Sequence, residues 1–129
     1  MADPFVGEIR MAAFNFAPQD WAGCDGQIMP ISQNMALYSL LGVQYGGDGK
    51  VTFALPDLRG RAPVCYNRDN QHVGDTGGTE TTQLLSGTPV NGVGSTKIVD
   101  PVAPAGNNMM PYLAVNFIIA LTGYYPERS

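Results

Sequence analysis

The sequence predicts a mainly β protein with one short α-helix. Glycine and proline are frequent, at 16 and 10 of 129 residues, which favours many short strands joined by turns over a helical bundle. Apolar side chains alternate along residues 5–13, and residues 112–121 form a nearly continuous apolar run rich in Val, Ile and Phe. One stretch, residues 33–41, carries apolar side chains at helical spacing. The length fits one domain.

The charge of the chain argues against several classes of partner. Charged residues make up 14% of the sequence, the formal net charge is −4, and Lys and Arg do not cluster. We therefore expect no nucleic-acid partner. No apolar run reaches the length of a transmembrane helix, so we expect no membrane insertion. Residues 1–4 lack the basic and long apolar regions of a signal peptide, so we expect synthesis in the cytoplasm without one.

The first expected element is a strand over residues 5–13. The apolar and small residues at its odd positions share one face: Phe5, Gly7, Ile9, Met11 and Ala13. Glu8 and Arg10 lie on the other face. This alternation predicts a strand that is buried on one face and solvated on the other.

Asp25-Gly26 predicts a β-hairpin. The dipeptide stands between two largely apolar runs, residues 21–24 and 27–29. Both central positions of such a tight turn need a positive φ, which Asp and Gly tolerate better than most residues. Trp21, the single tryptophan, opens the first run, and we interpret it as a core anchor rather than a platform for a ligand.

A short helix is expected over residues 33–41. Ser32 can cap its start, and Gly42 can end it in a left-handed conformation. The apolar stripe that this helix would bury comprises Leu37, Leu40 and Leu41. The glycine-rich stretch 45–50 follows, but it lacks the G-K-[ST] pattern of a phosphate-binding loop. Its single carboxylate, Asp48, is weak evidence for a cation site.

The stretch from Phe53 to Val64 predicts a fixed corner of the chain. Phe53 and Leu55 are two apart, as on one face of a strand. Pro56 lacks a backbone donor, so regular pairing should stop there. Asp57 can bond its own local backbone and shape the turn.

Arg59 and Arg61 flank Gly60 directly after this corner. Three interpretations are open for the two guanidinium groups. They could be solvated, they could clamp an anion, or they could bond a carboxylate across a subunit interface. We favour the interface, because the family resemblance given below implies an oligomer, and an obligate oligomer needs fixed polar contacts.

Several of these motifs together resemble the phage tail collar family, which also includes bacterial proteins called microcystin-dependent proteins. The FALPDLRGR core is similar to the family signature, and the W-x-x-CDGQ pattern is similar to its hairpin. The resembling segments are residues 3–10, 21–27, 31–42, 45–49, 53–61 and 111–121. They follow one another in the order expected for the family, and the resemblance covers about residues 3–66 and 106–126.

The resemblance implies a compact collar-like module that is intertwined in a homotrimer. Residues 1–66 would form the collar-like module, residues 67–110 a variable extended surface segment, and residues 111–129 a strand returning to the core plus a tail, all in one domain. Relatives in phages touch a cell surface with their distal ends. The resemblance therefore implies a cell-surface glycan or receptor as a partner, and a virion component or an extracellular appendage as the location.

The candidate site residues are structural or interfacial rather than catalytic. They are Trp21, Asp25, Gly26, Phe53, Leu55, Pro56, Asp57, Arg59 and Arg61. The only histidine, His72, stands in a polar stretch, and a solvated side chain is the simpler interpretation. Cys24 and Cys65 do not have metal-site spacing and are expected as free thiols. We predict no catalytic residue, no metal ligand and no cofactor. The histidine element that relatives carry is absent, so their metal binding is not transferred to this chain.

Three functions remain open from the sequence. The first is a structural subunit of a trimeric, tail-fibre-like extracellular appendage that binds a surface receptor. The second is a filament subunit whose trimers join end to end through the N-terminal strand and the tail, residues 121–129. The third, from a different class, is an enzyme that acts on a small molecule or a glycan.

Overall fold

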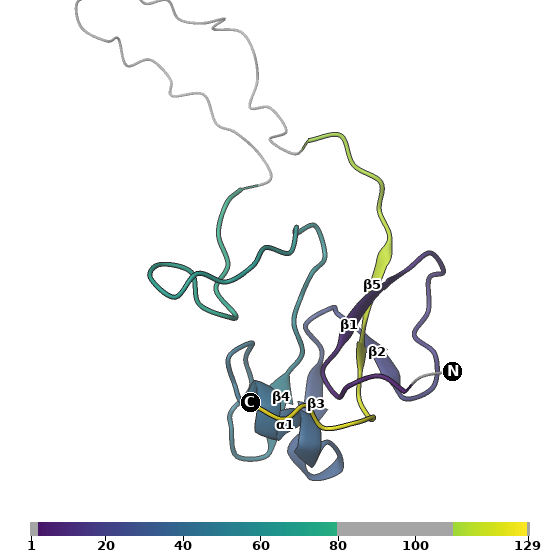
Figure 1. The fold of residues 1–129 in the computed structure, drawn as a ribbon, viewed down its shortest axis with the longest axis vertical. Coiled ribbons are helices and arrows are strands. Elements are labelled where there is room, and N and C mark those ends of the chain that lie inside the picture. Colours follow the sequence, from purple (N-terminus) through teal and green to yellow (C-terminus); the bar gives the residue numbers. More distant parts are fainter. Residues whose placement is uncertain (1–2, 80–109, 129) are drawn as a thin grey trace, which may run out of the picture. The chain divides into compact units, whose positions relative to one another are not determined.

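The computed structural model describes residues 3–79 and 110–128 (Figure 1). The chain divides into two units, one of residues 1–75 with 114–129 and one of residues 76–113. In the second unit the described residues, 76–79 and 110–113, contain no helix or strand. Most of the segment 67–110, expected to be variable and surface-facing, therefore lies outside the described residues. All elements below belong to the first unit.

The larger of the two sheets is three-stranded, with the order β1-β5-β2. Its strands are β1 (Ile9–Ala12), β2 (Trp21–Gly23) and β5 (Asn116–Ala120), and β5 is antiparallel to both neighbours. Figure 1 shows β5, which comes from the end of the chain, beside β1 and β2. Ile118, Ile119 and Ala120 are buried in succession, so β5 is covered on both faces. This confirms the doubly buried final strand, although it begins later than the apolar run does.

The smaller sheet pairs β3 (Ile28–Pro30) with β4 (Thr52–Ala54), also antiparallel. The predicted hairpin at Asp25-Gly26 is therefore wrong, because the strands on its two sides pair with different partners. Gly26 has a φ of 77°, but Asp25 does not have the positive φ that a tight hairpin turn of this kind needs. The short strand β2 pairs instead with β5, which lies more than 90 residues later in the chain.

The predicted helix is present as α1 (Met35–Leu41), after a single 3₁₀ turn over Ile31–Gln33. The expected Ser32 cap is wrong: Asn34 is the N-cap residue, and its Nδ2 donates to the Pro30 carbonyl instead of capping the helix. Leu37 is fully buried, whereas Leu40 and Leu41 are half-buried. At the other end Gly42 has the positive φ expected for it, 57°, but its ψ of −141° lies outside the left-handed helical region, so the left-handed conformation predicted for Gly42 is wrong.

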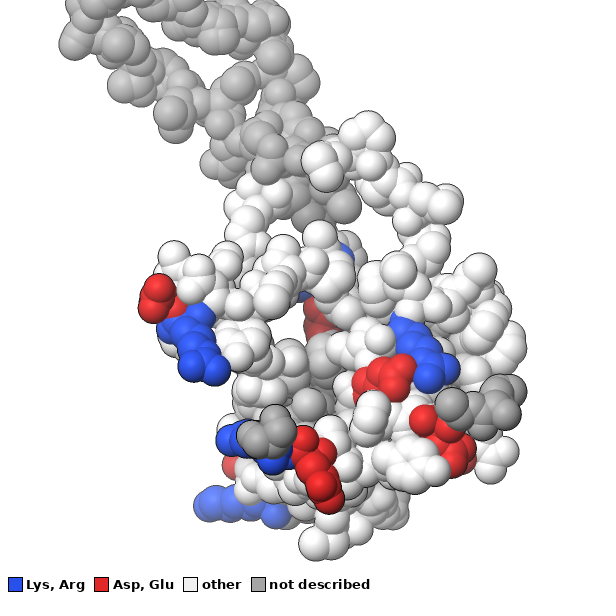
Figure 2. Space-filling model, viewed as in Figure 1, with Lys and Arg blue, Asp and Glu red and all other residues white. Residues whose placement is uncertain are grey.

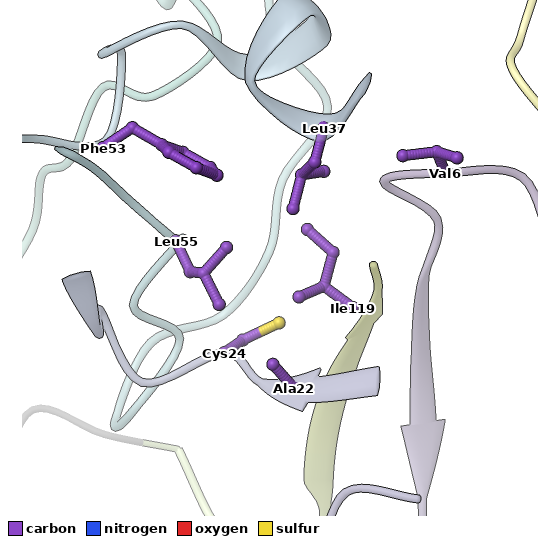
Figure 3. Close-up of a cluster of buried hydrophobic side chains, with 7 residues drawn as sticks. All are labelled: Val6, Ala22, Cys24, Leu37, Phe53, Leu55 and Ile119. Carbon is purple, nitrogen blue, oxygen red and sulfur yellow. The ribbon is translucent and has the colours of Figure 1, made fainter. Parts of the chain in front are cut away.

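The hydrophobic core joins both sheets and the helix (Figure 3). Its buried members are Val6, Ala22, Cys24, Leu37, Phe53, Leu55 and Ile119. Figure 3 shows Leu37, Leu55 and Ile119 converging at its centre, and Phe53 is likewise without solvent exposure. Each large buried side chain of this kind stabilises the fold by roughly 1.5–3 kcal/mol. The mainly β fold with one short helix is therefore the fold that the sequence predicted.

Strand β1 differs from the expectation of a half-buried strand. Ile9 and Met11 point to the core-bearing face of the sheet, since they pair with Ile119 and Phe117, yet they are 41% and 71% exposed. The reason is their position: β1 is at the edge of the sheet, and the core cluster contains no residue of this strand.

The two ends of the chain meet in a short parallel pairing. Phe5 and Tyr124 form an isolated bridge, with Val6 N donating to the Tyr124 carbonyl and Tyr124 N donating to the Pro4 carbonyl, both at 2.9 Å. The Tyr125 hydroxyl is 2.8 Å from Ser39 Oγ of α1. The tail, expected to lie on a neighbouring subunit, is thus held here by its own chain.

Candidate functional site

The corner after β4 is built from two segments that lie side by side. Leu55 N donates to the Gln27 carbonyl at 3.0 Å, Gly26 N to the Pro56 carbonyl at 3.1 Å, and Leu58 N to the Cys24 carbonyl at 2.9 Å. Asp25 and Asp57 form an isolated antiparallel bridge in the same ladder. The structure therefore brings the Asp25-Gly26 turn and the Pro56-Asp57 turn together, although the sequence presented them as separate motifs.

The apolar residues of the corner are buried. Phe53 and Leu55 are fully buried, and Pro56 is buried with them. A Cβ on Gly26 would lie 3.2 Å from Asp57 Cβ, which is tighter than ordinary contact. Since Gly26 also has a positive φ, glycine suits this position on two independent grounds.

Asp57 and Arg59 form a two-point ion pair on the surface of the corner. Asp57 Oδ1 accepts from Arg59 Nε at 2.8 Å, and Oδ2 accepts from Arg59 Nη2 at 2.9 Å. Asp57 Oδ1 also accepts from the Arg59 backbone N–H at 3.2 Å. The side-chain bonds from Arg59, followed by its backbone bond, lower the pKa of Asp57 to about 2. Asp57 thus shapes the turn as expected, and its carboxylate is already paired.

Arg59 and Arg61 remain candidates for contacts with another subunit. The Arg59 side chain is 71% exposed even while it bonds Asp57, and Arg61 is also exposed. In the described part of the chain no hydrogen bond from the Arg61 side chain is formed, although its charge contributes to the low pKa of Asp57.

We expect Arg59→Ala to lower the melting temperature of the assembly or to disrupt it. An exposed ion pair alone contributes little to stability, so a marked loss would indicate that Arg59 bonds a second subunit. Arg68→Ala is the matched control, since Arg68 is exposed and its side chain forms no hydrogen bond or ion pair in the described residues. Differential scanning calorimetry and light scattering measure the two effects. An Arg59→Ala protein that assembles and melts like the wild type would contradict the interface role.

Trp21 is not in the core cluster, contrary to the expectation of a core anchor. Neighbouring strand residues point to opposite faces, and Ala22 is the β2 residue that enters the core. Trp21 is half-buried on the other face, where the Arg10 guanidinium lies 5.2 Å from its ring centroid. Glu8 Oε2 accepts from Arg10 Nε at 2.6 Å, and this bond lowers the pKa of Glu8. The contact between Glu8 and Arg10 could have been predicted from the sequence, because the alternation along residues 5–13 places both on one face of the strand.

The glycine-rich loop is closed by its own carboxylate. Asp48 Oδ1 accepts from the backbone N–H groups of Lys50, Val51 and Thr52 at 2.8–2.9 Å. These three bonds, with the largest effect from that of Thr52, hold the pKa of Asp48 well below its usual range. The carboxylate is thus used to order the loop, and the loop precedes β4 and the corner.

No catalytic or metal-binding site is evident in the described residues. Within residues 3–79 and 110–128, no group of three His, Cys, Asp or Glu side chains is placed to hold a metal ion. His72 Nδ1 lies 3.5 Å from Asp75 Oδ2 in an exposed turn. Both cysteines are free; Cys65 is exposed, and burial raises the pKa of Cys24 to about 11, which makes it an unreactive thiol. In the same described residues, no helix is long and apolar enough to cross a membrane.

The surface carries charges of both signs and a substantial apolar part. Figure 2 shows Lys and Arg interspersed with Asp and Glu on the visible face, most of which is uncharged. We define the β1 face as Ile9, Met11 and Phe117. Ile9 and Met11 are exposed, Phe117 is half-buried against the core, and all three lie on the core-bearing face of the sheet. The apolar core of the sheet therefore continues to the surface at β1 without a cover in the described residues.

Comparison with protein-family models finds one match, the Phage Tail Collar Domain, over residues 7–63. The match begins just before β1 and ends just after Arg61, so it contains β1 to β4, α1 and the corner. It does not include β5, which completes the larger sheet. No curated protein matches the chain. The resemblance to microcystin-dependent proteins stays a prediction.

Proposed function

Because residues 7–63 belong to the phage tail collar domain family, we propose that this chain is a structural subunit of a trimeric appendage of the phage tail-fibre type. Collar domains are structural modules, and the described residues carry an ordered polar corner and no evident catalytic group. A structural role therefore fits better than the enzyme acting on a small molecule or glycan.

The observation that best supports the proposed trimer is the exposed, apolar β1 face. Ile9 and Met11 lie on the same side of the sheet as the buried core, and yet they are open to solvent. β1 is also an edge strand, so its outer edge has no strand partner in the described residues. Apolar side chains beside an open strand edge are typical of a surface that another subunit covers. We propose that this face packs against the equivalent module of neighbouring subunits.

The location and receptor follow from the same proposal. As a collar-type subunit the protein would be a virion component or part of an extracellular appendage. The segment 67–110 would extend from the trimer and contribute to contact with a cell-surface receptor. The ordered module of residues 1–66, with the strand from residues 111–129, would provide the trimeric base.

The trimer is tested by multi-angle light scattering on the purified full chain. We expect a mass about three times the 13.7 kDa of one chain at micromolar concentration. The reason is that burying the β1 face removes apolar surface from water in each of the subunits. A mass of one chain over the whole concentration range would refute the oligomer.

A filament of stacked trimers is the second candidate, and the chain ends favour it. Phe5, Tyr124 and Tyr125 are all at least half exposed at the place where the two ends pair. A repeated contact between unlike surfaces that does not close gives a fibre. The same light-scattering series separates the candidates, because a filament subunit would exceed the trimer mass and grow with concentration.

A further inference from the structure

The outward backbone groups of β1 have no partner. Ala120 N donates to the Glu8 carbonyl at 3.0 Å, and the antiparallel register runs on from there along β1. Bonded pairs alternate along such a ladder, so the N–H and C=O groups of Ile9 and Met11 point away from β5. In the described residues none of these groups forms a hydrogen bond. They are therefore free to bond a further strand.

Two of the other strands carry local bonds at their outward positions. At β2, which pairs with β5 on one side only, Trp21 N donates to the Pro18 carbonyl at 3.0 Å. At β4, which pairs with β3 on one side, Ala54 N donates to the Gly46 carbonyl at 3.1 Å. The loops beside these strands thus use backbone donors that an added strand would need.

Strand β3 is protected by a proline. Ile31 N donates to the Val51 carbonyl at 2.9 Å, so by the same alternation Ile28 and Pro30 point away from β4. Pro30 has no N–H, and its carbonyl already accepts from Asn34 Nδ2 at 3.0 Å. Proline at an edge is a common protection against pairing with another chain. Among the described strands, β1 alone therefore has an outer edge that is open along its length.

Residues 112–115 have the composition of a strand and no strand partner. The apolar run begins at residue 112, whereas β5 begins at Asn116. Tyr112, Leu113 and Val115 are 70%, 87% and 40% exposed, and no backbone group of residues 112–115 is bonded in the described part of the chain. Figure 1 shows this stretch extended directly ahead of β5. A β-prone apolar stretch without a partner is typical of a strand that pairs with another chain.

We propose that residues 112–115 of one subunit add to the outer edge of β1 in a neighbouring subunit, as a fourth strand of its larger sheet. The added strand bonds the free backbone groups of Ile9 and Met11, and its apolar side chains cover theirs. The two surfaces are unlike, so the contact can close into a ring of three, whereas β1 paired with a second β1 would give a two-fold dimer. The inference rests on the proposed trimer and names the segment of the second copy that occupies the β1 face.

Met11→Pro tests the acceptor edge. It removes an outward N–H and leaves the bonds between β1 and β5 in place, and proline is tolerated at such edge positions. We expect light scattering on the full chain to give the mass of one subunit instead of three. Ile28→Pro is the matched control, because Ile28 is 58% exposed and its N–H also points outward, but from β3. The control should keep the wild-type mass, and circular dichroism checks both folds.

Leu113→Asp tests the added strand from the other side. A carboxylate at this position would have to be buried against the apolar β1 face, so we again expect the mass of one subunit. Met110→Asp is its control, since Met110 is 79% exposed and is separated from the segment by Pro111. This control should keep the wild-type mass.

Cross-linking identifies the two partners directly. In a Cys65→Ser background, a tagged chain with Met11→Cys and an untagged chain with Leu113→Cys are co-expressed and treated with a short bismaleimide. The remaining thiol, Cys24, is buried. We expect a covalent pair of one tagged and one untagged chain, at a level well above the cross-linked pairs of either variant alone.

The outcomes separate this inference from the trimer itself. A wild type with the mass of one chain would refute the trimer, and the strand addition with it. A trimeric wild type whose Met11→Pro and Leu113→Asp variants keep their mass, or whose mixed chains do not cross-link, would overturn the strand addition alone. If Met11→Pro fails to fold, the Leu113→Asp variant and the cross-linked pair decide.

Discussion

Gly47→Ala should unfold the first unit, residues 1–75 and 114–129, or lower its free energy of unfolding by at least about 3 kcal/mol. Gly47 has a φ of 96°, which an L-residue adopts at a cost of about 1–2 kcal/mol. An added Cβ would also collide with Phe53 Cα and lie 2.8 Å from the Thr52 carbonyl oxygen and 2.9 Å from the Phe53 carbonyl carbon. These are backbone atoms of β4, so they cannot move away as the end of a side chain can.

Movement of β4 would displace Phe53, which is fully buried in the core. We therefore expect the melting temperature to fall by about 10 °C or more. Thermal and urea unfolding followed by circular dichroism measure the effect.

Gly42→Ala provides the matched control for this substitution. Gly42 also has a positive φ, 57°, but no atom outside its immediate neighbours lies within 4 Å of the position of its Cβ. The stability lost in Gly42→Ala should be confined to the cost of placing an L-residue at a φ of 57° and a ψ of −141°, about 1–3 kcal/mol. Equal losses in the two variants would show that the close packing of Gly47 on β4 does not contribute.

Met11→Asp should convert the trimer into monomers. Met11 is 71% exposed in the single chain, and the proposed assembly covers it with apolar surface of a neighbouring subunit. A carboxylate buried there without a partner would cost several kcal/mol in each subunit. In the monomer the same side chain would be solvated, so the fold itself should be retained. Light scattering gives the mass, and circular dichroism checks the secondary structure.

Met35→Asp is the control for a new charge at an exposed methionine. Met35 is 67% exposed and is not one of the three residues of the β1 face. It stands at the start of α1, where a negative charge interacts favourably with the helix dipole. This variant should have the same oligomeric state as the wild type. A trimeric Met11→Asp protein would show that the β1 face is not the subunit interface, even if the wild type is a trimer.

The corner and the final strand were predictable because their causes are local. Pro56 has no backbone N–H to donate, and Asp57 Oδ1 accepts from the backbone N–H of Arg59, two residues later. Both effects act within a few residues. The run that contains β5 is apolar at successive positions, which indicates burial on both faces whatever its partners are. The positive φ of Gly42 was predictable in the same way, from the end of an apolar helical stripe.

Strand partners and surface exposure were decided only by the tertiary structure. Asp25-Gly26 has the composition of a hairpin turn, but β2 pairs with β5 from the far end of the chain, and no local pattern encodes that choice. The same long-range pairing places Ala22 in the core and Trp21 outside it. Residues 5–13 show which side chains share a face, but not whether that face is covered. The sequence by itself therefore determined the element types and the local turns, since these depend on neighbouring residues. The tertiary structure decided which strands pair and which apolar face stays open, because burial depends on segments more than 90 residues apart.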